Sequence, residues 1–140
     1  MKNDFVQPPI LEIPDLSKEF CLRTDASAVG LGAVLLQYHE EVPKPVAYAS
    51  YKLLDRETRY STVERECLGI VWGIERFKHY LYGRKFILEV DHRPLIYLEN
   101  FKGSNSRLLR WSLALQPFQF SCVYISGEKN HFSDILSRSG

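Results

Sequence analysis

The sequence predicts an α/β domain built on a five-stranded mixed sheet, in which an antiparallel meander is followed by two parallel strands and helices flank the sheet. Three observations predict this class: three consecutive strand-like segments are joined by short links, one long amphipathic helix follows them, and strands then alternate with helices. The 140 residues, 45% of them hydrophobic and 25% charged, suit a single compact domain.

The first part of the chain is expected to supply the meander. Residues 1–18 contain Pro8, Pro9 and Pro14 and are expected to form an extended connector ahead of a domain at 19–140. The predicted strands are Phe20–Thr24, Leu31–Tyr38 and Val46–Tyr51, with Gly30 and Gly32 in the first turn region and His39-Glu40-Glu41, Pro43 and Pro45 in the second. Short links between consecutive strands favour antiparallel pairing.

The clearest helix begins at Ser61-Thr62-Val63-Glu64, a capping-box pattern in which the serine and the glutamate satisfy each other's backbone donors. Its apolar stripe consists of Val63, Cys67, Ile70, Val71, Ile74 and Phe77, which recur at helical spacing. The helix is expected to stop near Gly83, with Lys78 and His79 in its last turns.

Strands and helices alternate in the rest of the chain. Phe86–Val90 is a predicted fourth strand, in which Ile87 and Glu89 alternate, and Asp91 follows it. The remaining predictions are a short helix from Pro94, a helix over Arg107–Leu115, a fifth strand over Phe118–Ile125, and a last helix capped by Asn130 that reaches Arg138.

Charge and composition exclude several classes of protein. A net charge of +1 is too small for a strongly basic stand-alone nucleic-acid binder. No apolar stretch is long enough to cross a bilayer and residues 1–9 lack the run of a signal peptide, so we expect an intracellular protein. Cys21, Cys67 and Cys122 are widely spaced among apolar neighbours, which indicates core residues rather than a disulfide or a zinc site.

The order of the elements predicts that acidic residues meet at one edge of the sheet. A right-handed crossover through the long helix places the fourth strand beside the first and parallel to it, so that Asp25 and Asp91 end neighbouring strands at the same edge. Asp134 lies one turn into the last helix, which begins at that edge. Glu66 lies in the second turn of the long helix, where Glu64 flanks the apolar stripe at a similar angle and is an alternative.

Four carboxylates in one place would repel one another unless a cation lay between them. Oxygen ligands without a cysteine or histidine cluster favour magnesium, or manganese, over zinc. Two such ions can support hydrolysis of a phosphodiester. Taken singly, Asp25 and Asp91 also fit ordinary turn residues and Asp134 fits a favourable charge at a helix start, so only the combination indicates a site.

Ordered sequence blocks resemble a known family over nearly all of residues 8–138. They are LRTDASAVGLGAVLLQ at 22–37, YSTVERECLGIVWGIERFKHYLYGRKF at 60–86, VDHRPL at 90–95, RW at 110–111 and GEKNHFSDILSR at 127–138. Together they resemble the ribonuclease H domain of gypsy-type long-terminal-repeat retrotransposons, which is similar to that of retroviruses and plant pararetroviruses.

The resemblance implies a ribonuclease H-like fold with four acids on two magnesium ions, for which manganese can substitute. It implies that Asp25 bridges both ions, that Asp134 holds the ion that activates water, and that Glu66 and Asp91 hold the ion on the leaving-group side. The block ERECLGI selects Glu66 over Glu64. The implied products carry a 5′ phosphate and a 3′ hydroxyl, and contacts to 2′-hydroxyls would spare DNA.

Some positions depart from the family pattern. Tyr51 replaces an arginine or lysine of many relatives, and Ser133 replaces the usual alanine. Residues 126–129 form a short loop without the histidine that often assists product release. His131 is a candidate for that accessory role, although a histidine at this place is more often a solvated residue of the first helical turn.

Candidate contacts to nucleic acid lie near the predicted acids and on the later helices. They are Ser27, His92, Arg93, Arg107, Arg110 and Asn130. Lys102 and Trp111 extend the patch around Arg107 and Arg110, and the alternative for this patch is a solvated helix face with Trp111 in the core.

We therefore expect a metal-dependent endonuclease that cuts the RNA strand of RNA/DNA hybrids during reverse transcription. Its expected partners are the hybrid and the polymerase and connection segments of a reverse transcriptase polyprotein, with no membrane. Its expected locations are the cytoplasm, within virus-like particles, and the nucleus. The alternatives are a catalytically silent scaffold of a domesticated retroelement and a related metal nuclease acting on DNA, such as an integrase or resolvase.

Overall fold

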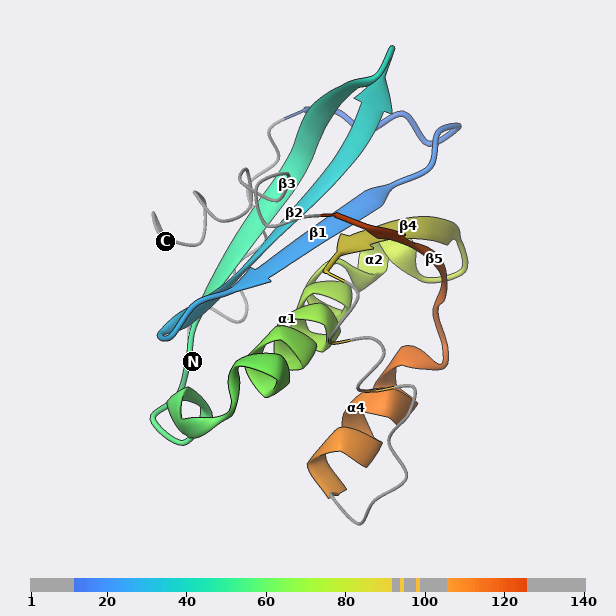
Figure 1. The fold of residues 1–140 in the computed structure, drawn as a ribbon. Helices are drawn as coiled ribbons and strands as arrows, with labels where there is room; N and C mark the ends of the chain where they lie inside the picture. The colour runs from blue at the N-terminus through green and yellow to red at the C-terminus, as the bar shows by residue number, and fades with distance from the viewer. Residues whose placement is uncertain (1–11, 92–93, 95–97, 99–105, 126–140) are drawn as a thin grey trace.

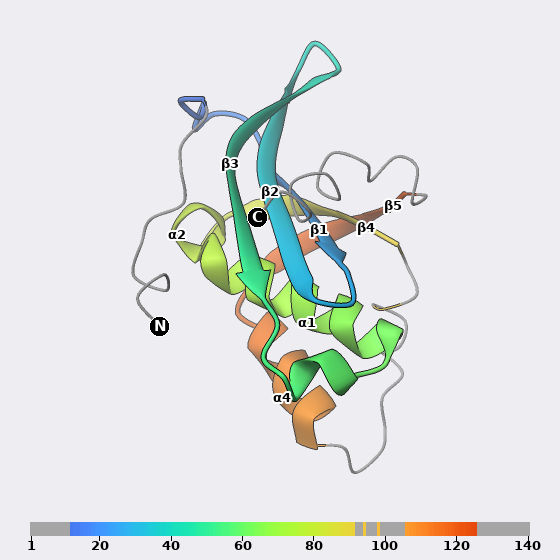
Figure 2. The same cartoon turned by 90° about the vertical axis from the view of Figure 1, so that its left-hand side faces the viewer.

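The computed structural model describes residues 12–91, 94, 98 and 106–125. Its sheet consists of β1 (Cys21–Ala26), β2 (Gly30–His39), β3 (Val42–Lys52), β4 (Lys85–Val90) and β5 (Gln119–Tyr124). The helices are α1 (Thr62–Arg76), α2 (Lys78–Leu81), α4 (Ser106–Leu115) and the short 3-10 helix η2 (Glu57–Arg59). Figures 1 and 2 show α1 lying along one face of the sheet, with α4 and the tip of the β2–β3 hairpin at opposite ends of the molecule.

The strand order is β3-β2-β1-β4-β5, with β1 in the centre. β1 pairs with β2 and β2 with β3 in antiparallel fashion, whereas β1 pairs with β4 and β4 with β5 in parallel. The predicted antiparallel meander followed by two parallel strands is therefore confirmed. The carboxyl ends of β1, β4 and β5 consequently lie at one edge of the sheet.

The prediction that the third strand begins at Val46 was wrong, because β3 begins at Val42 and includes Pro43 and Pro45. The turn needs only Glu40 and Glu41, which have φ of 53° and 69° and match a two-residue hairpin turn of the type that twists with its strands. β3 is an edge strand, where a residue without an N–H donor is tolerated.

Helix α1 begins as predicted. The Ser61 side chain accepts a hydrogen bond from the Glu64 N–H (3.1 Å), and the Glu64 side chain accepts one from the Ser61 N–H (3.0 Å). The prediction of one continuous helix was wrong in one detail, because the backbone departs from helical geometry at Phe77 (φ −108°) and then resumes for the single turn of α2. Gly83, at φ 79°, follows α2, which agrees with the expected stop.

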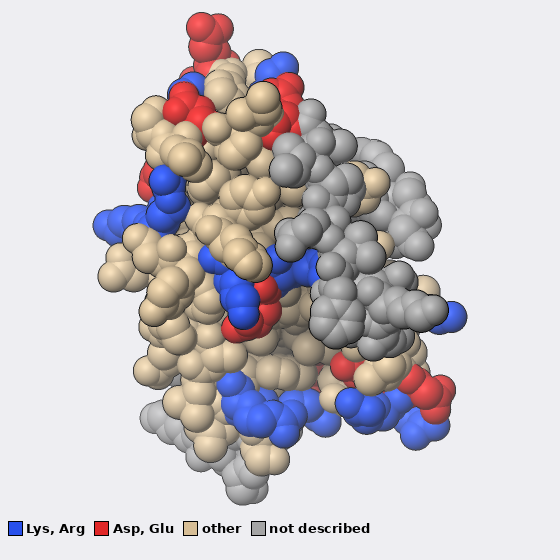
Figure 3. Space-filling view, turned by 180° about the vertical axis from the view of Figure 1, so that it is seen from behind, with Lys and Arg blue, Asp and Glu red and all other residues tan. Residues whose placement is uncertain are grey.

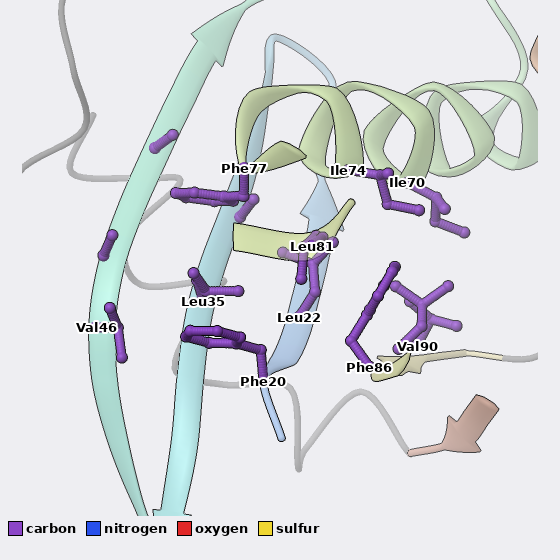
Figure 4. Close-up of a cluster of buried hydrophobic side chains, with 14 residues drawn as sticks. Phe20, Leu22, Leu35, Val46, Ile70, Ile74, Phe77, Leu81, Phe86 and Val90 are labelled. Carbon is purple, nitrogen blue, oxygen red and sulfur yellow. The ribbon is translucent and has the colours of Figure 1, made fainter. Parts of the chain in front are cut away.

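One face of the sheet and α1 enclose the main core. Figure 4 shows Ile70, Ile74 and Phe77 pointing from the helical layer toward the sheet. The core consists of Phe20, Leu22, Ala33, Leu35, Val46, Ala47, Ala49, Ile70, Ile74, Phe77, Leu81, Phe86, Leu88 and Val90, all buried. Of the predicted stripe, Ile70, Ile74 and Phe77 face this core, whereas Val63, Cys67 and Val71 belong to a second cluster.

Helix α4 packs on α1 through a second apolar cluster that contains Cys67, Val71, Leu108 and Trp111. Trp111 is thus a core residue, which confirms the structural interpretation of that side chain. Pro94 is helical, but the extent of its helix and the whole of the predicted helix after Asn130 lie outside the described residues. Within the described part, no helix combines the length and the apolar character needed to cross a membrane.

The segment before β1 is bound to the domain. The Gln37 amide, fully buried on β2, accepts a hydrogen bond from the Asp15 N–H (2.9 Å) and donates to the Asp15 carbonyl (2.8 Å). Both terminal nitrogens of Arg84 donate to the Leu16 carbonyl at 3.2 Å. The last residues of the predicted connector therefore lie against β2 and the start of β4.

Candidate active site

Two of the four predicted acids lie at the carboxyl edge of the sheet, with Asp25 on β1 and Asp91 directly after the neighbouring parallel strand β4. The β1–β4 register ends with Arg23 opposite Glu89, and Asp25 and Asp91 each come two residues later in the sequence. Val90 still pairs with Tyr124, and its carbonyl accepts a hydrogen bond from the Ile125 N–H (3.1 Å), so β4 stays paired with β5 up to the residue before Asp91. Neighbouring strands are about 4.8 Å apart, and we therefore expect Asp25 and Asp91 to lie near each other at the carboxyl edge.

The side chains of this pair belong to the sheet face opposite α1. A Cβ atom on Gly73 of α1 would lie 2.8 Å from Thr24 Cγ2, so Thr24 faces the helix, as Val90 does in the main core. Side chains alternate along a strand, and Asp25 and Asp91 therefore project to the other face. We call these two residues the aspartate pair.

Glu66 lies on α1, which runs antiparallel to β1. The Cβ position of Gly69 lies 3.7 Å from the Asp25 carbonyl oxygen, and that of Gly73 lies beside Thr24 and Leu22, farther from the carboxyl edge. Glu66 precedes Gly69 by three residues, or about 4.5 Å of helix, and is therefore displaced toward the carboxyl edge. Helical side chains also lean toward the helix start, which brings the Glu66 carboxylate closer to that edge.

The three described acids thus come from three elements that meet at one edge of the sheet. Within residues 12–91, 94, 98 and 106–125, no group of three or more histidine, cysteine, aspartate or glutamate side chains is placed so as to hold a metal ion. Asp134, the fourth predicted ligand, lies outside the described residues. The ligand set Asp25, Glu66, Asp91 and Asp134 therefore stays a prediction.

Glu64 has a different role from Glu66. Its Oε1 accepts the capping hydrogen bond from Ser61, and its Oε2 accepts one from Arg107 Nη2 at 2.6 Å. Burial alone would raise the pKa of Glu64, but the hydrogen bonds from Arg107 and Ser61 outweigh burial and lower it. With both carboxylate oxygens engaged inside the protein, Glu64 is a poor candidate for a metal ligand.

Arg107, a predicted nucleic-acid contact, is held by its own domain. Its guanidinium lies 4.0 Å from the Tyr60 ring centroid and 5.8 Å from that of Trp111, in addition to its ion pair with Glu64. The hydrogen bond to Glu64 is the main reason why the pKa of Arg107 is raised. Arg107 thus links α4 to the start of α1, and its contact to nucleic acid stays a prediction.

The other predicted nucleic-acid contacts differ in their surroundings in the structure. The Ser27 hydroxyl accepts hydrogen bonds from the N–H groups of Val29 (3.3 Å) and Gly30 (3.0 Å), and it therefore helps to close the β1–β2 turn beside Asp25. Arg110 is exposed on α4. The predictions that fall outside the described residues are His92, Arg93, Lys102, Asn130, His131 and Ser133.

Tyr51, at the position where relatives often have a cation, has a structural role. Its hydroxyl donates a hydrogen bond to Glu57 Oε1 (2.8 Å), and its ring lies 5.8 Å from that of Trp72 on α1. Glu57 also accepts a hydrogen bond from the Leu54 N–H (2.8 Å). Tyr51 therefore stabilises the connection between β3 and α1.

Sequence reasoning missed two polar contacts near the acids. Arg23 and Glu89 form an ion pair at 2.7 Å on the sheet face opposite α1, and sequence reasoning assigned no partner to Glu89. The Cys67 thiol, adjacent to Glu66, donates to the Pro94 carbonyl (3.3 Å) and links α1 to the segment after Asp91. A charge flanked by apolar residues within a strand, as in Leu88-Glu89-Val90, was the available signal for the first contact.

Charge on the described surface is mixed. Figure 3 shows separate small groups of Lys, Arg, Asp and Glu atoms on a mostly tan face, with blue atoms gathered in a band near its lower end. This agrees with the small net charge of +1. Binding of a polyanion would thus depend on local cations and on neighbouring segments rather than on a uniformly basic face.

Comparisons with known proteins agree with this arrangement. The family described as "RNase H-like domain found in reverse transcriptase" matches residues 15–118. The chain is 44% identical over 138 residues to the retrovirus-related Pol polyprotein from transposon 412 of Drosophila melanogaster, and 40% identical over 143 residues to the transposon Tf2-3 polyprotein of Schizosaccharomyces pombe. Each match covers 99% of this chain and 11% of the polyprotein.

Solved structures with similar folds include cellular and viral proteins. RNase H1 from the halophilic archaeon Halobacterium salinarum matches with a TM-score of 0.64 and 13% identity, over 86% of this chain and 96% of that one. The foamy viral protease-reverse transcriptase in complex with an RNA/DNA hybrid matches with a TM-score of 0.63 and 18% identity, over 84% of this chain and 16% of that one. These structures share the fold of the five-stranded sheet described above.

Proposed function

This chain belongs to the family of RNase H-like domains found in reverse transcriptase, in the branch carried by retrotransposon Pol polyproteins, and we propose that it is an active ribonuclease H. Its proposed reaction is hydrolysis of the RNA strand of an RNA/DNA hybrid, within the chain rather than from its ends. The proposed products carry a 5′ phosphate and a 3′ hydroxyl.

The observation that carries this proposal is the aspartate pair. Asp25 lies near the end of β1, and Asp91 directly follows β4, the neighbouring parallel strand. Carboxyl ends of parallel strands are where open α/β sheets usually place their sites. Two carboxylates held side by side repel each other, which makes the pair a poor choice for a purely structural edge and a suitable one for binding cations.

The chemistry of the donor set fits magnesium. Asp25, Glu66 and Asp91 offer only carboxylate oxygens, and Asp134 would add a fourth carboxylate. When bound, two magnesium ions would supply charge stabilisation at the phosphate and a nucleophilic water at neutral pH. The protein's own contribution would be to orient the carboxylates and to position the scissile phosphate above them.

The proposed substrate is the hybrid because the family acts within reverse transcriptase. Discrimination against DNA would come from contacts to 2′-hydroxyls across the shallow minor groove. Ser27 in the β1–β2 turn and His92 and Arg93 after Asp91 are the proposed contacts closest in sequence to the acids. The chain spans 11% of the polyproteins it matches, and we propose that polymerase and connection segments of such a polyprotein help to hold the hybrid.

Replacement of one acid tests the proposal. In Asp25→Asn, we expect hydrolysis of a hybrid labelled on its RNA strand to slow by at least on the order of a thousandfold, because the amide removes a charged metal ligand worth several kcal/mol. The matched control is Asp55→Asn, whose carboxylate forms only an exposed ion pair with Arg59. Rates are measured in magnesium, with duplex DNA as the second substrate.

The control should cut like the wild type, and duplex DNA should stay intact. Equal cutting by Asp25→Asn and the wild type would refute the role of Asp25. A wild type that cuts neither substrate, even when joined to its polymerase segments, would favour the silent scaffold instead. A wild type that cuts duplex DNA would favour the DNA-nuclease alternative.

A further inference from the structure

Three side chains from three strands form a hydrogen-bonded network on the sheet face that carries the aspartate pair. Arg23 Nε donates to Glu89 Oε1 (2.7 Å), and Arg23 Nη2 donates to the Tyr38 hydroxyl (2.9 Å). The Tyr38 hydroxyl in turn donates to Glu89 Oε2 (2.7 Å). The network therefore ties β2, β1 and β4 together through side chains, and we call it the Arg23 network.

The network is largely withdrawn from solvent. The Arg23 side chain is 12% exposed and that of Glu89 is 8% exposed. Tyr38 packs against the apolar cluster of Cys21, Val34 and Leu36, which lies on this face of the sheet. Charges in such surroundings are expensive unless they are paired and hydrogen-bonded, so each member depends on the others.

The position of the network relative to the acids is fixed by the strand register. Arg23 pairs with Glu89 across β1 and β4, and the next two residues that project to the same face are Asp25 and Asp91. Residues two apart on a strand are separated by about 6.6 Å, so the ion pair forms the row directly beneath the aspartate pair. A shift of β4 against β1 would break the ion pair and separate the two aspartates at the same time.

We infer that Arg23, Glu89 and Tyr38 are positioning residues that hold Asp25 and Asp91 level for the reaction. This inference rests on the proposed function, because it concerns the same two acids. The network touches neither substrate nor metal in this role. Arg23 and Glu89 fix the separation of the two strands, and Tyr38 fixes the direction of the Glu89 carboxylate by holding one of its oxygens.

Two substitutions test the network, one by removing a charge and the other by removing a single hydroxyl. Glu89→Gln keeps the shape of the side chain and removes its charge, and Tyr38→Phe removes one hydroxyl while leaving the ion pair in place. Replacing a group that orients metal-binding side chains typically lowers metal affinity or activity by about 10–100-fold. We expect losses of this size in magnesium affinity and in kcat. We expect KM for the hybrid to stay near its wild-type value, because the network does not touch nucleic acid.

Two controls separate positioning from stability. Tyr48→Phe removes a hydroxyl from a residue that packs on the same apolar cluster, and Val46→Ala creates a cavity in the main core on the edge strand β3. Both should bind magnesium and cut hybrid like the wild type at temperatures well below their unfolding transitions. If Glu89→Gln does not fold, Tyr38→Phe still tests the inference, because that variant retains both charges.

A third readout is independent of catalysis. Hydrogen exchange of the backbone amides at Asp25 and Asp91 should accelerate on the order of tenfold in Glu89→Gln, since the strands are less tightly held, and should not change in Val46→Ala. If the wild type is active and both Glu89→Gln and Tyr38→Phe equal it in magnesium affinity, kcat and hydrogen exchange, the positioning role is refuted. The proposed function would still stand in that case. A wild type that neither binds magnesium nor cuts hybrid would overturn the proposed function, and unchanged exchange would then also refute the positioning role.

Discussion

Charged residues near the candidate site have different roles, which depend on the residues that they contact. Glu64 and Glu66 are two positions apart on α1, yet Glu64 is engaged by Ser61 and Arg107 while Glu66 lies toward the carboxyl edge of the sheet. Sequence spacing alone left the two glutamates as alternatives. The hydrogen bonds of Glu64 give the physical reason to separate a structural glutamate from a candidate ligand.

Glu64→Gln should lower the free energy of unfolding by about 1 kcal/mol at pH 7, because charge-assisted hydrogen bonds to Arg107 and Ser61 are weakened. The folded-state pKa of Glu64 lies below its ordinary value of 4.5, so this contribution is present above pH 4.5 and is lost as pH falls through the folded-state pKa. Urea unfolding of both proteins from pH 7 to pH 3 measures the difference. A gap that widens on acidification would contradict the assignment.

The buried thiols should be unreactive in the folded protein. Burial raises the pKa of Cys21 and of Cys67 from 9.0 to about 12, and alkylation requires the thiolate. We expect iodoacetamide at pH 8 to label these two cysteines only after unfolding in urea, as measured by mass spectrometry of peptides. Rapid labelling of Cys67 in the native state would show that its contact to Pro94 is not maintained.

At the scale of elements, the close approach of α1 to β1 sets where Glu66 lies relative to the aspartate pair. Gly69 and Gly73 face the sheet at this contact, and both are buried. The capping box fixes where the helix starts, and the two glycines allow it to lie against the strand. Together these features determine how close Glu66 lies to the carboxyl edge of the sheet.

Alanine substitutions at the two glycines should have opposite effects on stability. A Cβ at Gly73 would lie 2.8 Å from Thr24 Cγ2 and 3.3 Å from Ala33 Cβ, so Gly73→Ala should destabilise by about 1–3 kcal/mol. At Gly69 the nearest atoms are at 3.7 Å, so Gly69→Ala should gain up to about 1 kcal/mol from helix propensity. Denaturant titrations of both variants measure this, and destabilisation by Gly69→Ala would show tighter packing than described.

The elements themselves were largely predictable, and the exceptions have local causes. Apolar periodicity and the capping box predicted α1 and its start, but no break in periodicity marks Phe77, where the helix is interrupted. Pro43 and Pro45 looked like turn residues because prolines rarely occur inside a sheet. Their position on an edge strand depends on the strand order, which strand patterns alone do not give.

For the whole molecule, chain order and the handedness of crossovers predicted the strand order of the sheet, while the meeting of the four acids stays a prediction. The Arg23 network was not predictable in the same way, because polar residues that alternate with apolar ones normally indicate a solvated face. Arg23 and Glu89 are instead buried together. Partnerships between distant strands depend on register and on side-chain reach, which require the three-dimensional structure.

Magnesium binding by the aspartate pair and Glu66 at the carboxyl edge of the sheet is the proposal on which the others depend. Titration of ¹⁵N-labelled protein with magnesium, followed by amide chemical shifts, tests it most directly, with Asp25→Asn as the reference. We predict saturable shifts at Asp25, Glu66 and Asp91 that are lost or strongly weakened in the variant. Shifts confined to other residues, or identical titrations of the two proteins, would contradict the claim.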